Sequence, residues 1–292
     1  MNLLITNDDG IDSVFLHELV RALRAAAHAI HVVAPKTEQS WISKAMSRSR
    51  PVHAERNDGR IPGFDGPTWI VDGTPSDCVN IALHHLLPDK PDGVVSGPNI
   101  GCNAGLPFIL GSGTIAGAIE ATFHGFPAAA ISQDLTVEAF DAIKSAHGRP
   151  GDAVLATLRI SCRRAAQLLP ELLGSGIGVQ SSGSDQAQGS GPSTFDPRPS
   201  TVVHNLNFPF PCTLQTEVKR TVPARVLIGS LFAPAQADGS HHFRFGFGEE
   251  IPPPPPAAGL PPPLSDQVCL AQGCISHTVL DYGRLGHPGR TP

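Results

Sequence analysis

The first 135 residues alternate between short apolar runs and longer segments whose apolar residues recur at helical spacing, and this alternation restricts the fold more than any other feature. Residues 3–5 and 32–34 are typical of the short runs, which are too brief for helices and are characteristic of buried strands. Because strand and helix patterns succeed one another at the spacing of strand–helix–strand units, the sequence predicts a parallel sheet covered by helices on both faces.

The predicted fold class is α/β, with a Rossmann-like, doubly wound and mostly parallel sheet and a smaller, β-rich C-terminal extension. The expected strands are residues 2–6, 30–34, 68–71, 93–96, 127–132, 201–205 and 274–280. The expected helices are residues 13–27, 77–87, 114–123 and 152–173, and Thr74 or Ser76 is expected to cap the second of them.

Composition suggests how the rest of the chain is divided. Residues 1–175 and 201–209 are expected to form the α/β core, whereas Gly, Ser, Pro and Gln dominate residues 180–200 and predict a flexible loop. Residues 210–250 are expected to form a hairpin-like extension, with strands over 225–231 and 241–247 around the turn Asp238-Gly239. Residues 251–264 predict an extended, proline-rich linker, and residues 265–292 a C-terminal strand and tail.

Several classes of function are disfavoured by composition. The formal net charge is -5 and the chain has no long basic run, which argues against binding to a nucleic acid polymer. No stretch of about 18 apolar residues is present, so no membrane association is expected. The chain starts on a strand pattern without a charged-then-apolar leader, which predicts a cytoplasmic protein. The six cysteines contain no CxxC pair, so neither a zinc site nor a redox dithiol is indicated.

Two adjacent carboxylates, Asp8 and Asp9, are separated from the first expected strand only by Asn7 and precede Gly10. Open α/β sheets bind ligands at the carboxyl ends of their strands, and two like charges placed there favour a divalent cation that offsets them. The alternative is local, since an Asp before a turn glycine and an amphipathic helix is also an ordinary helix N-cap. The tetrapeptide alone does not decide between the two.

Two further loops at the same edge of the predicted sheet offer oxygen ligands. Ser40 follows the second strand, where its hydroxyl is suited to a ligand or metal, although it is also an ordinary turn residue. Asn99 and Asn103 follow the strand at 93–96 among three glycines, an arrangement whose backbone can approach an anion closely. A simple Gly/Asn turn is the alternative for that loop.

A fourth loop, with Ser112, Gly113 and Thr114, opens the helix expected at 114–123. Small hydroxyl residues and a glycine at a helix N-terminus form a phosphate cradle, although Ser112 or Thr114 as a plain N-cap is a competing interpretation. Because cation-type oxygens and phosphate-type donors converge on one edge, phosphoryl chemistry with Mg²⁺ or Mn²⁺ is favoured. The chain lacks GxxxxGK[ST] and a GxGxxG after the first strand, which disfavours P-loop and dinucleotide enzymes.

The chain resembles the SurE family of survival-protein nucleotidases. The resemblance is carried by seven segments in order: LLITNDDGI, VVAP followed by QS, GTPSDCV, SGPNIGCNAG, GSGTIAGAIE, GFPAAAIS and the Asn-Leu-Asn-Phe-Pro segment at 205–209. A SurE-like fold is implied, together with metal-dependent hydrolysis of nucleoside 5′-monophosphates, and also of 3′-monophosphates and short polyphosphate. The resemblance also implies a small-molecule nucleotide substrate, one divalent ion per subunit and a homo-oligomer, a dimer or a tetramer.

The resemblance further implies that four residues bind the metal: Asp8, Asp9, Ser40 and Asn99. It suggests that Asn103, Ser112, Gly113 and Thr114 surround the phosphate. Asp8 or Asp9 is the candidate general base or, alternatively, a nucleophile that becomes an aspartyl phosphate, and the sequence does not choose between these roles. Asp77, within GTPSDCV, is expected to act as a structural residue of a helix N-terminus.

Trp41 departs from the pattern, because the family usually has glycine after the metal-binding serine. An indole at this position is expected either to narrow the site or to stack on a nucleobase. The alternative function is a non-catalytic nucleotide- or metal-binding regulator on the same scaffold, in which Trp41 blocks the reactive geometry. A weaker alternative is an adaptor that recruits a partner through its proline-rich segment.

Overall fold

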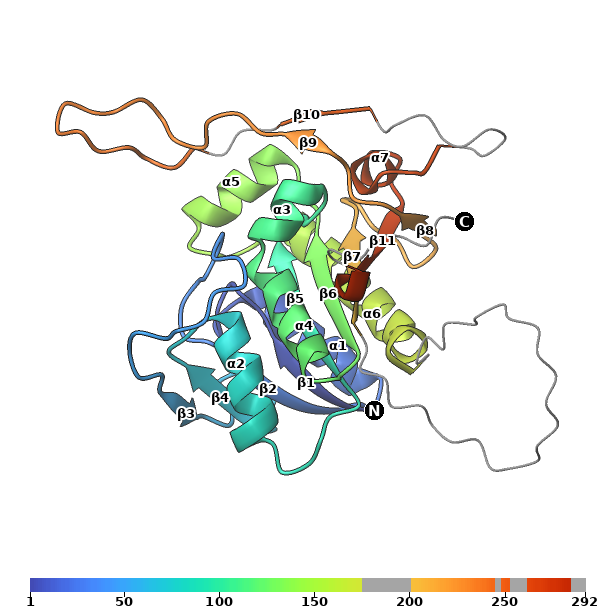
Figure 1. Cartoon of the computed structure of the whole chain (residues 1–292). Coiled ribbons are helices and arrows are strands. Elements are labelled where there is room, and N and C mark those ends of the chain that lie inside the picture. Colours follow the sequence, from blue (N-terminus) through green and yellow to red (C-terminus); the bar gives the residue numbers. More distant parts are fainter. Residues whose placement is uncertain (175–200, 245–247, 253–261, 285–292) are drawn as a thin grey trace.

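The computed structural model describes residues 1–174, 201–244, 248–252 and 262–284. Its centre is a nine-stranded sheet with the strand order β3-β4-β2-β1-β5-β6-β7-β11-β8 (Figure 1). The neighbours from β4 to β7 are parallel, β3 is antiparallel to β4, and β11 is antiparallel to β7 but parallel to β8. The predicted Rossmann-like, doubly wound and mostly parallel sheet is therefore confirmed.

The elements have the following bounds. The strands are β1 (Asn2–Thr6), β2 (Ala29–Pro35), β3 (Ala54–Arg56), β4 (Thr68–Val71), β5 (Gly93–Ile100), β6 (Ala128–Gln133), β7 (Val202–Phe208), β8 (Val218–Thr221), β9 (Val226–Leu227), β10 (Glu249–Glu250) and β11 (Ile275–Asp281). The helices are α1 (Val14–Ala25), α2 (Pro75–Ile81) with its π-helical continuation η1 (Ala82–Leu86), α3 (Leu106–Gly111), α4 (Gly113–Phe123), α5 (Val137–Ser145), α6 (Asp152–Gly174), α7 (Asp266–Ala271) and the short 3₁₀ turn η2 (Tyr282–Arg284).

Alternating side chains of the central strands divide the core into two layers. Leu3 and Ile5 of β1 pack with α1 and α6 on one face, whereas Leu4 between them packs with α2 and α4 on the other. Figure 1 shows α2 and α4 on the opposite side of the sheet from α1 and α6. This period of two is what strands buried on both faces require, and it accounts for the continuous apolar runs in the sequence.

The strand order reverses beside β1. From β1 the chain adds β2 and β4 on one side and β5, β6 and β7 on the other. The carboxyl ends of β1 and β5 therefore lie at the topological switch point, the place at which open α/β sheets bind ligands. The loop with Asp8 and Asp9 leaves β1 at this switch point, and Asn99 lies at the end of β5 beside it.

The structure differs from the sequence prediction in several elements. The strand expected at 93–96 continues to Ile100, with a register shift against β6 between Ser96 and Asn99. Helices α3, α5 and α7 and strands β3 and β8 were not predicted; most are short, and Thr136 and Ser265, which cap α5 and α7, are the clearest local signals. Thr74 caps α2 in a capping box with Asp77, as expected of a structural residue.

Residues 210–250, expected as a separate extension, are shared between two structures. Residues 218–221 join the main sheet as β8, where they pair with β11. The described residues of segment 226–250, which are 226–244 and 248–250, form a long hairpin whose base is β9 paired with β10 and whose arms meet again at the Phe232–Phe243 bridge. Figure 1 shows this hairpin extending beyond the sheet. The predicted loop at 180–200 and most of the proline-rich segment lie outside the described residues.

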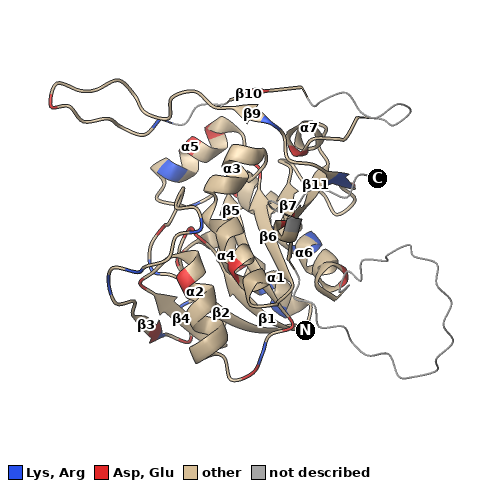
Figure 2. Ribbon diagram, viewed as in Figure 1, with Lys and Arg blue, Asp and Glu red and all other residues tan. Residues whose placement is uncertain are grey.

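Charge and hydropathy of the described residues agree with the composition. None of the helices in the described ranges has the length and apolar character needed to cross a lipid bilayer. Figure 2 shows the Lys and Arg positions of the described chain dispersed among acidic ones, not gathered along one element. The six cysteine thiols are all free, and five of them are buried.

A histidine pair between β7 and β11 predicts a pH dependence of stability. His204 and His277 are joined by a ring nitrogen hydrogen bond of 2.9 Å. Burial lowers the pKa of each to about 4, and the nearby Arg220 acts in the same direction. Between pH 6.5 and 4, His204 and His277 are protonated in the unfolded chain but mostly neutral in the folded chain. The free energy of unfolding therefore falls as the pH falls through this window. We expect a loss of roughly 1–2 kcal/mol from the pair after solvent screening.

Urea denaturation between pH 7 and pH 4 measures this effect. Buried carboxylates titrate in the same range, so the comparison is between the wild type and the double variant His204→Gln, His277→Gln. The variant should show a weaker loss of stability on acidification. An identical slope in both proteins would contradict the assignment.

Candidate active site

Asp8 is the second residue after β1 and is almost completely buried. Its Oδ1 accepts a 2.5 Å hydrogen bond from the hydroxyl of Thr114, in the first turn of α4. Gly113 packs directly against it, since a Cβ on residue 113 would lie 2.8 Å from the Asp8 Cβ. Burial raises the pKa of Asp8 to about 6, while the hydroxyl and backbone N–H of Thr114 act in the opposite direction. The N-terminus of α4 therefore faces this carboxylate.

Asp9 completes the acidic pair and points toward the end of β5. Its Oδ2 accepts a 3.0 Å hydrogen bond from the backbone N–H of Ile100. Burial raises its pKa well above the usual value, and the charge of Asp8 raises it further. Two mutually repelling carboxylates at a strand end lack a full protein counter-charge, so the arrangement is suited to a bound cation.

Ser40 lies in the loop after β2, which is attached to the acidic loop by a hydrogen bond from the Gln39 N–H to the Asp8 carbonyl. The Ser40 hydroxyl donates to Glu38 over 2.7 Å, and Lys144 of α5 donates to the same carboxylate oxygen over 2.6 Å. Burial opposes the charged form of Glu38, but these two donors outweigh it and hold its pKa below the usual value. Because Ser40 gives its proton to Glu38, its oxygen lone pairs are left for another partner.

Asn99 is positioned by the irregular end of β5. Gly97 adopts φ +121° within the strand, and the register shift that follows it re-aims the residues at the strand end. The side-chain NH₂ of Asn99 donates to the carbonyl of Gly101 over 2.7 Å, so its Oδ1 is the atom suited to a cation. The structure thus brings Asp8, Asp9 and Asn99 to one switch point, with Ser40 in the adjoining loop.

Asn103 is held in a buried amide network, and its hydrogen bonds in the described structure go to β6 and β7. Its backbone N–H donates to Asn207 over 2.7 Å, and its carbonyl accepts from Asn205 over 2.9 Å. Its side-chain NH₂ donates to Ser132 over 3.0 Å, so that group is already engaged in this structure. The phosphate-binding role of Asn103 stays a prediction.

Ser112 is the N-cap of α4, and its hydroxyl oxygen accepts from the Ile115 N–H over 3.1 Å. Ser112 therefore acts as a plain helix N-cap through its oxygen. The proton of its hydroxyl is still available for a hydrogen bond to a ligand. Trp41 lies against the preceding residue, because a Cβ on Gly111 would be 3.2 Å from the indole Cε3. The indole therefore lies over Gly111, two residues before the first residue of α4.

Five residues of this arrangement were not identified from the sequence as site residues: Glu38, Lys144, Asn205, Asn207 and Asp266. Glu38 and Lys144 support Ser40, while the other three hold the loop after β5; Asp266 accepts from the Gly105 N–H over 2.8 Å and from the Ala224 N–H over 2.8 Å. The position of Glu38 two residues before Ser40 was a signal that the sequence offered. Asn205 and Asn207 lie in the Asn-Leu-Asn-Phe-Pro segment that carries part of the family resemblance, whereas Lys144 and Asp266 reach the site through long-range contacts that leave no local pattern.

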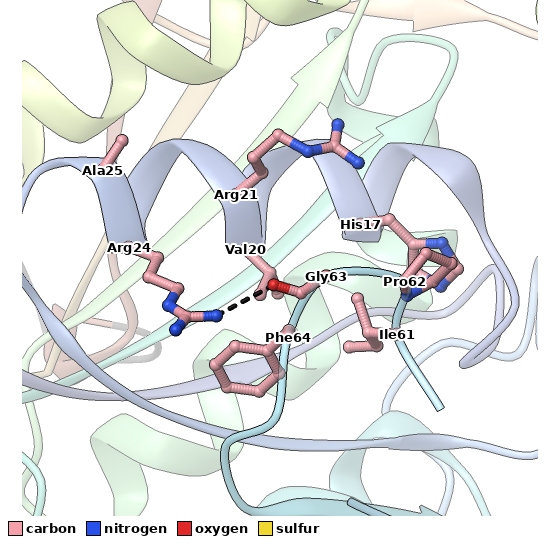
Figure 3. A pocket seen from close by; sticks show the side chains of 9 residues that line it. All are labelled: His17, Val20, Arg21, Arg24, Ala25, Ile61, Pro62, Gly63 and Phe64. Atoms are coloured by element: carbon pink, nitrogen blue, oxygen red, sulfur yellow. Dashed lines mark hydrogen bonds between the residues drawn. The ribbon is translucent and has the colours of Figure 1, made fainter. Parts of the chain in front are cut away.

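A cavity of about 330 Å³ lies elsewhere, between α1 and the loop at 61–64 (Figure 3). None of the predicted site residues lines it. Its cationic side chains are already engaged, with Arg24 donating to the Gly63 carbonyl over 2.8 Å and pairing with Asp65, and Arg21 pairing with Glu18. This cavity therefore does not compete with the acidic switch point as the candidate site.

The donor set at the switch point fits a hard divalent cation. Within the described ranges, no group of three His, Cys, Asp or Glu residues is placed to hold a metal ion. A cation here would need amide and hydroxyl oxygens beside the two carboxylates, which is the ligand chemistry of Mg²⁺ and Mn²⁺. The buried Oδ1 of Asn7, in the same loop, has no hydrogen-bond partner in the described structure, which also fits a site that expects a further group.

The contact between Glu38 and Ser40 gives a testable prediction. Glu38→Gln removes the charge that pairs with Lys144 and weakens the acceptor that orients Ser40. Loss of such a supporting hydrogen bond typically costs about 10–100-fold in metal affinity, so we expect the metal concentration for half-maximal activity to rise by about tenfold or more. Glu55→Gln, at an exposed position of β3, is the matched control and should leave it unchanged. Equal metal dependence in both variants would show that Glu38 does not support the site.

Fold and site together define a Rossmann-like α/β protein with an oxygen-donor acidic site at its topological switch point. Comparison with known proteins supports this assignment of fold and site. The sequence model of the survival protein SurE family matches residues 3–227, and the chain belongs to this family. The predicted family resemblance is therefore confirmed.

Individual relatives show the same similarity. The chain is 47% identical over 134 residues to the 5′-nucleotidase SurE of Desulfovibrio desulfuricans, covering 46% of this chain and 50% of that protein. It is 43% identical over 135 residues to the 5′-nucleotidase SurE of Desulforudis audaxviator, covering 45% and 50%. The chain thus spans about half the length of the curated relatives it matches. The crystal structure of the SurE protein from Aquifex aeolicus has a TM-score of 0.66 and 23% identity, covers 96% of this chain and 93% of that one, and shows the same fold.

Proposed function

We propose that this chain is a metal-dependent phosphomonoesterase that hydrolyses nucleoside 5′-monophosphates to nucleoside and phosphate. The observation that carries the proposal is the Asp8–Asp9 pair at the switch point, with the buried Asp8 facing the N-terminus of α4. The names of the relatives, which are 5′-nucleotidases, support the same reaction. Hydrolysis of 3′-monophosphates and short polyphosphate, a cytoplasmic location and assembly into a dimer or tetramer stay predictions.

Asp8, Asp9, Ser40 and Asn99 are proposed to hold one divalent ion, Mg²⁺ or Mn²⁺. When bound, such an ion would polarise a phosphoryl oxygen and lower the pKa of a nearby water molecule. Thr114 fixes the Asp8 carboxylate by its hydroxyl, and the positive end of α4 stabilises negative charge beside it. Gly113 permits the close approach of α4 to Asp8 because it carries no side chain.

The phosphate is proposed to lie between the acidic pair and the first turn of α4. Ser112 retains a hydroxyl proton that can be donated to a phosphate oxygen, since its oxygen is the acceptor in the helix cap. Asn103 is proposed to border the phosphate through its backbone, which Asn205 and Asn207 of β7 hold in place by hydrogen bonds. Rigid support of this kind is what holds reacting groups in a productive geometry.

Phosphate release from a panel of substrates tests the proposal. The panel contains 5′- and 3′-nucleoside monophosphates and short polyphosphate, each with Mg²⁺, Mn²⁺ or EDTA. We expect release from the 5′-monophosphates with at least one metal and none with EDTA. Absence of release with every metal would reject the enzyme, and metal-dependent nucleotide binding without release would favour the regulator instead.

A further inference from the structure

Trp41 has an unusual backbone conformation for a large side chain. It follows Ser40 directly and adopts φ +58°, in the left-handed region that favours glycine. Ser43, two residues later, also has a positive φ of +57°, and its N–H and hydroxyl bond to the carbonyls of Gly111 and Leu110. The loop is thereby fixed to the end of α3, and the indole is held in one place beside α4.

Aromatic rings from two other segments surround the indole. Phe108 of α3 meets it edge-on, with ring centroids 6.0 Å apart at 78°, and Phe243 of the 226–250 hairpin lies 5.5 Å away at 58°. Phe232 packs edge-on against Phe243 at 5.9 Å. We call Trp41, Phe108 and Phe243 the aromatic wall. Trp41 is 40% exposed and Phe243 is 48% exposed, so the wall offers accessible ring surface.

We propose that the aromatic wall binds the nucleobase of the substrate by stacking. The inference rests on the proposed function and names the part of the substrate that this surface recognises. Trp41 lies between the two elements assigned to the reacting end: it follows Ser40 in sequence, and its indole covers Gly111, the residue before Ser112. In a nucleoside monophosphate the base is one sugar away from the phosphate, so a phosphate at α4 brings the base to this neighbourhood.

The chemistry of the wall agrees with a base as its occupant. Aromatic side chains stack on every nucleobase because each base has a π-face, and larger rings gain more contact. The wall has no charged member, and its one hydrogen-bond donor is the indole N–H of Trp41, which is too little to distinguish the bases by their hydrogen-bond patterns. A broad preference for nucleotides over base-free phosphate esters, with purines ahead of pyrimidines, follows.

Selectivity between two esters tests the proposal. Adenosine 5′-monophosphate and ribose 5-phosphate share the phosphate and sugar but differ in the base. Trp41→Leu should lower the ratio of their kcat/KM values by about tenfold, and Trp41→Phe should restore most of it, because stacking on one aromatic ring is typically worth about 5–150-fold. An equal loss for both esters in Trp41→Leu would overturn the proposal. A wild-type dimer that Trp41→Leu dissociates, with an unchanged ratio, would assign the wall to a second copy and also overturn it.

Fluorescence provides a readout that does not depend on turnover. The chain has only two tryptophans, Trp41 and Trp69, so Trp69→Phe leaves Trp41 as the single reporter, and Trp41→Phe leaves Trp69. Adenosine, which has no phosphate, should quench the first protein saturably and leave the second unaffected. No saturable quenching of Trp41, or the same response from both proteins, would overturn the inference. If neither ester is hydrolysed the proposed function fails, and this titration still decides the nucleobase surface.

Discussion

Asp9→Asn is expected to lower kcat/KM for a nucleoside 5′-monophosphate by about 100-fold or more, at saturating metal, while the fold is retained. Asparagine keeps the size of the side chain and an oxygen that can accept the Ile100 N–H, but it removes the negative charge. Charge stabilisation by a metal site contributes several kcal/mol to the transition state, and each 1.36 kcal/mol is tenfold in rate. The loss should therefore appear in the rate and in metal affinity together.

The same substitution should increase stability in EDTA. Asp8 raises the pKa of Asp9 and burial disfavours both charges, so removing one of them relieves repulsion. Higher thermal stability with lower activity is the expected combination, measured by melting in EDTA and by phosphate release. Asp12→Asn is the control, because Asp12 follows in the same loop but pairs with Arg60 on the surface. Activity of Asp9→Asn within threefold of the wild type would remove Asp9 from the proposed site.

Gly97→Ala is expected to be the most destabilising small substitution in the sheet. Gly97 adopts φ +121°, and a Cβ there would lie 2.2 Å from the carbonyl oxygen of Ile131 in β6. Neither atom belongs to a flexible side chain, so β5 and β6 would have to separate. Strain at such a φ and overpacking each cost about 1–3 kcal/mol, which gives on the order of 4 kcal/mol and a melting point lower by roughly 10 °C.

Two other glycines separate backbone strain from the clash. Gly148 has φ +82° and no atom within 4 Å of the place that a Cβ would occupy, so Gly148→Ala should cost about 1 kcal/mol from conformation alone. Gly151 has open space and no positive φ, so Gly151→Ala should be nearly neutral. Thermal unfolding of the three variants should rank them in this order. Equal melting points for Gly97→Ala and Gly148→Ala would show that the β5–β6 contact gives way at little cost.

The sequence predicted those parts of the fold and site that depend on local pattern. The strand before Asp8, the helix after Gly113 and the placement of four loops at one edge follow from apolar periodicity and from the direction of parallel strands. The end of β5 was not predicted, because Gly97-Pro98 is a turn signal and yet lies inside the strand. Pairing of Asn99 with Ser132 of β6 overrides that signal, and the register shift accommodates it.

The residues that support Ser40 and the loop after β5 could not be predicted from local sequence patterns, for a different reason. Lys144 comes from α5, a nine-residue helix whose cap at Thr136 is its clearest mark. Asn205, Asn207 and Asp266 reach the loop after β5 from 102, 104 and 161 residues away. A single sequence contains no trace of such pairings, although the Asn-Leu-Asn-Phe-Pro segment marked two of the three as unusual.

The bond between Asp266 and the Gly105 N–H has a consequence for how the protein is made. The carboxylate that fixes this loop is synthesised 161 residues after the loop itself. At about 5–20 residues per second, the ribosome takes roughly 10–30 s to cover that interval. During this time the acidic pair and the first turn of α4 have already been synthesised, but the loop after β5 lacks its hydrogen bond to Asp266. A nascent chain would therefore present Asp8 and Asp9 beside a loop that stays unanchored until Asp266 has been synthesised.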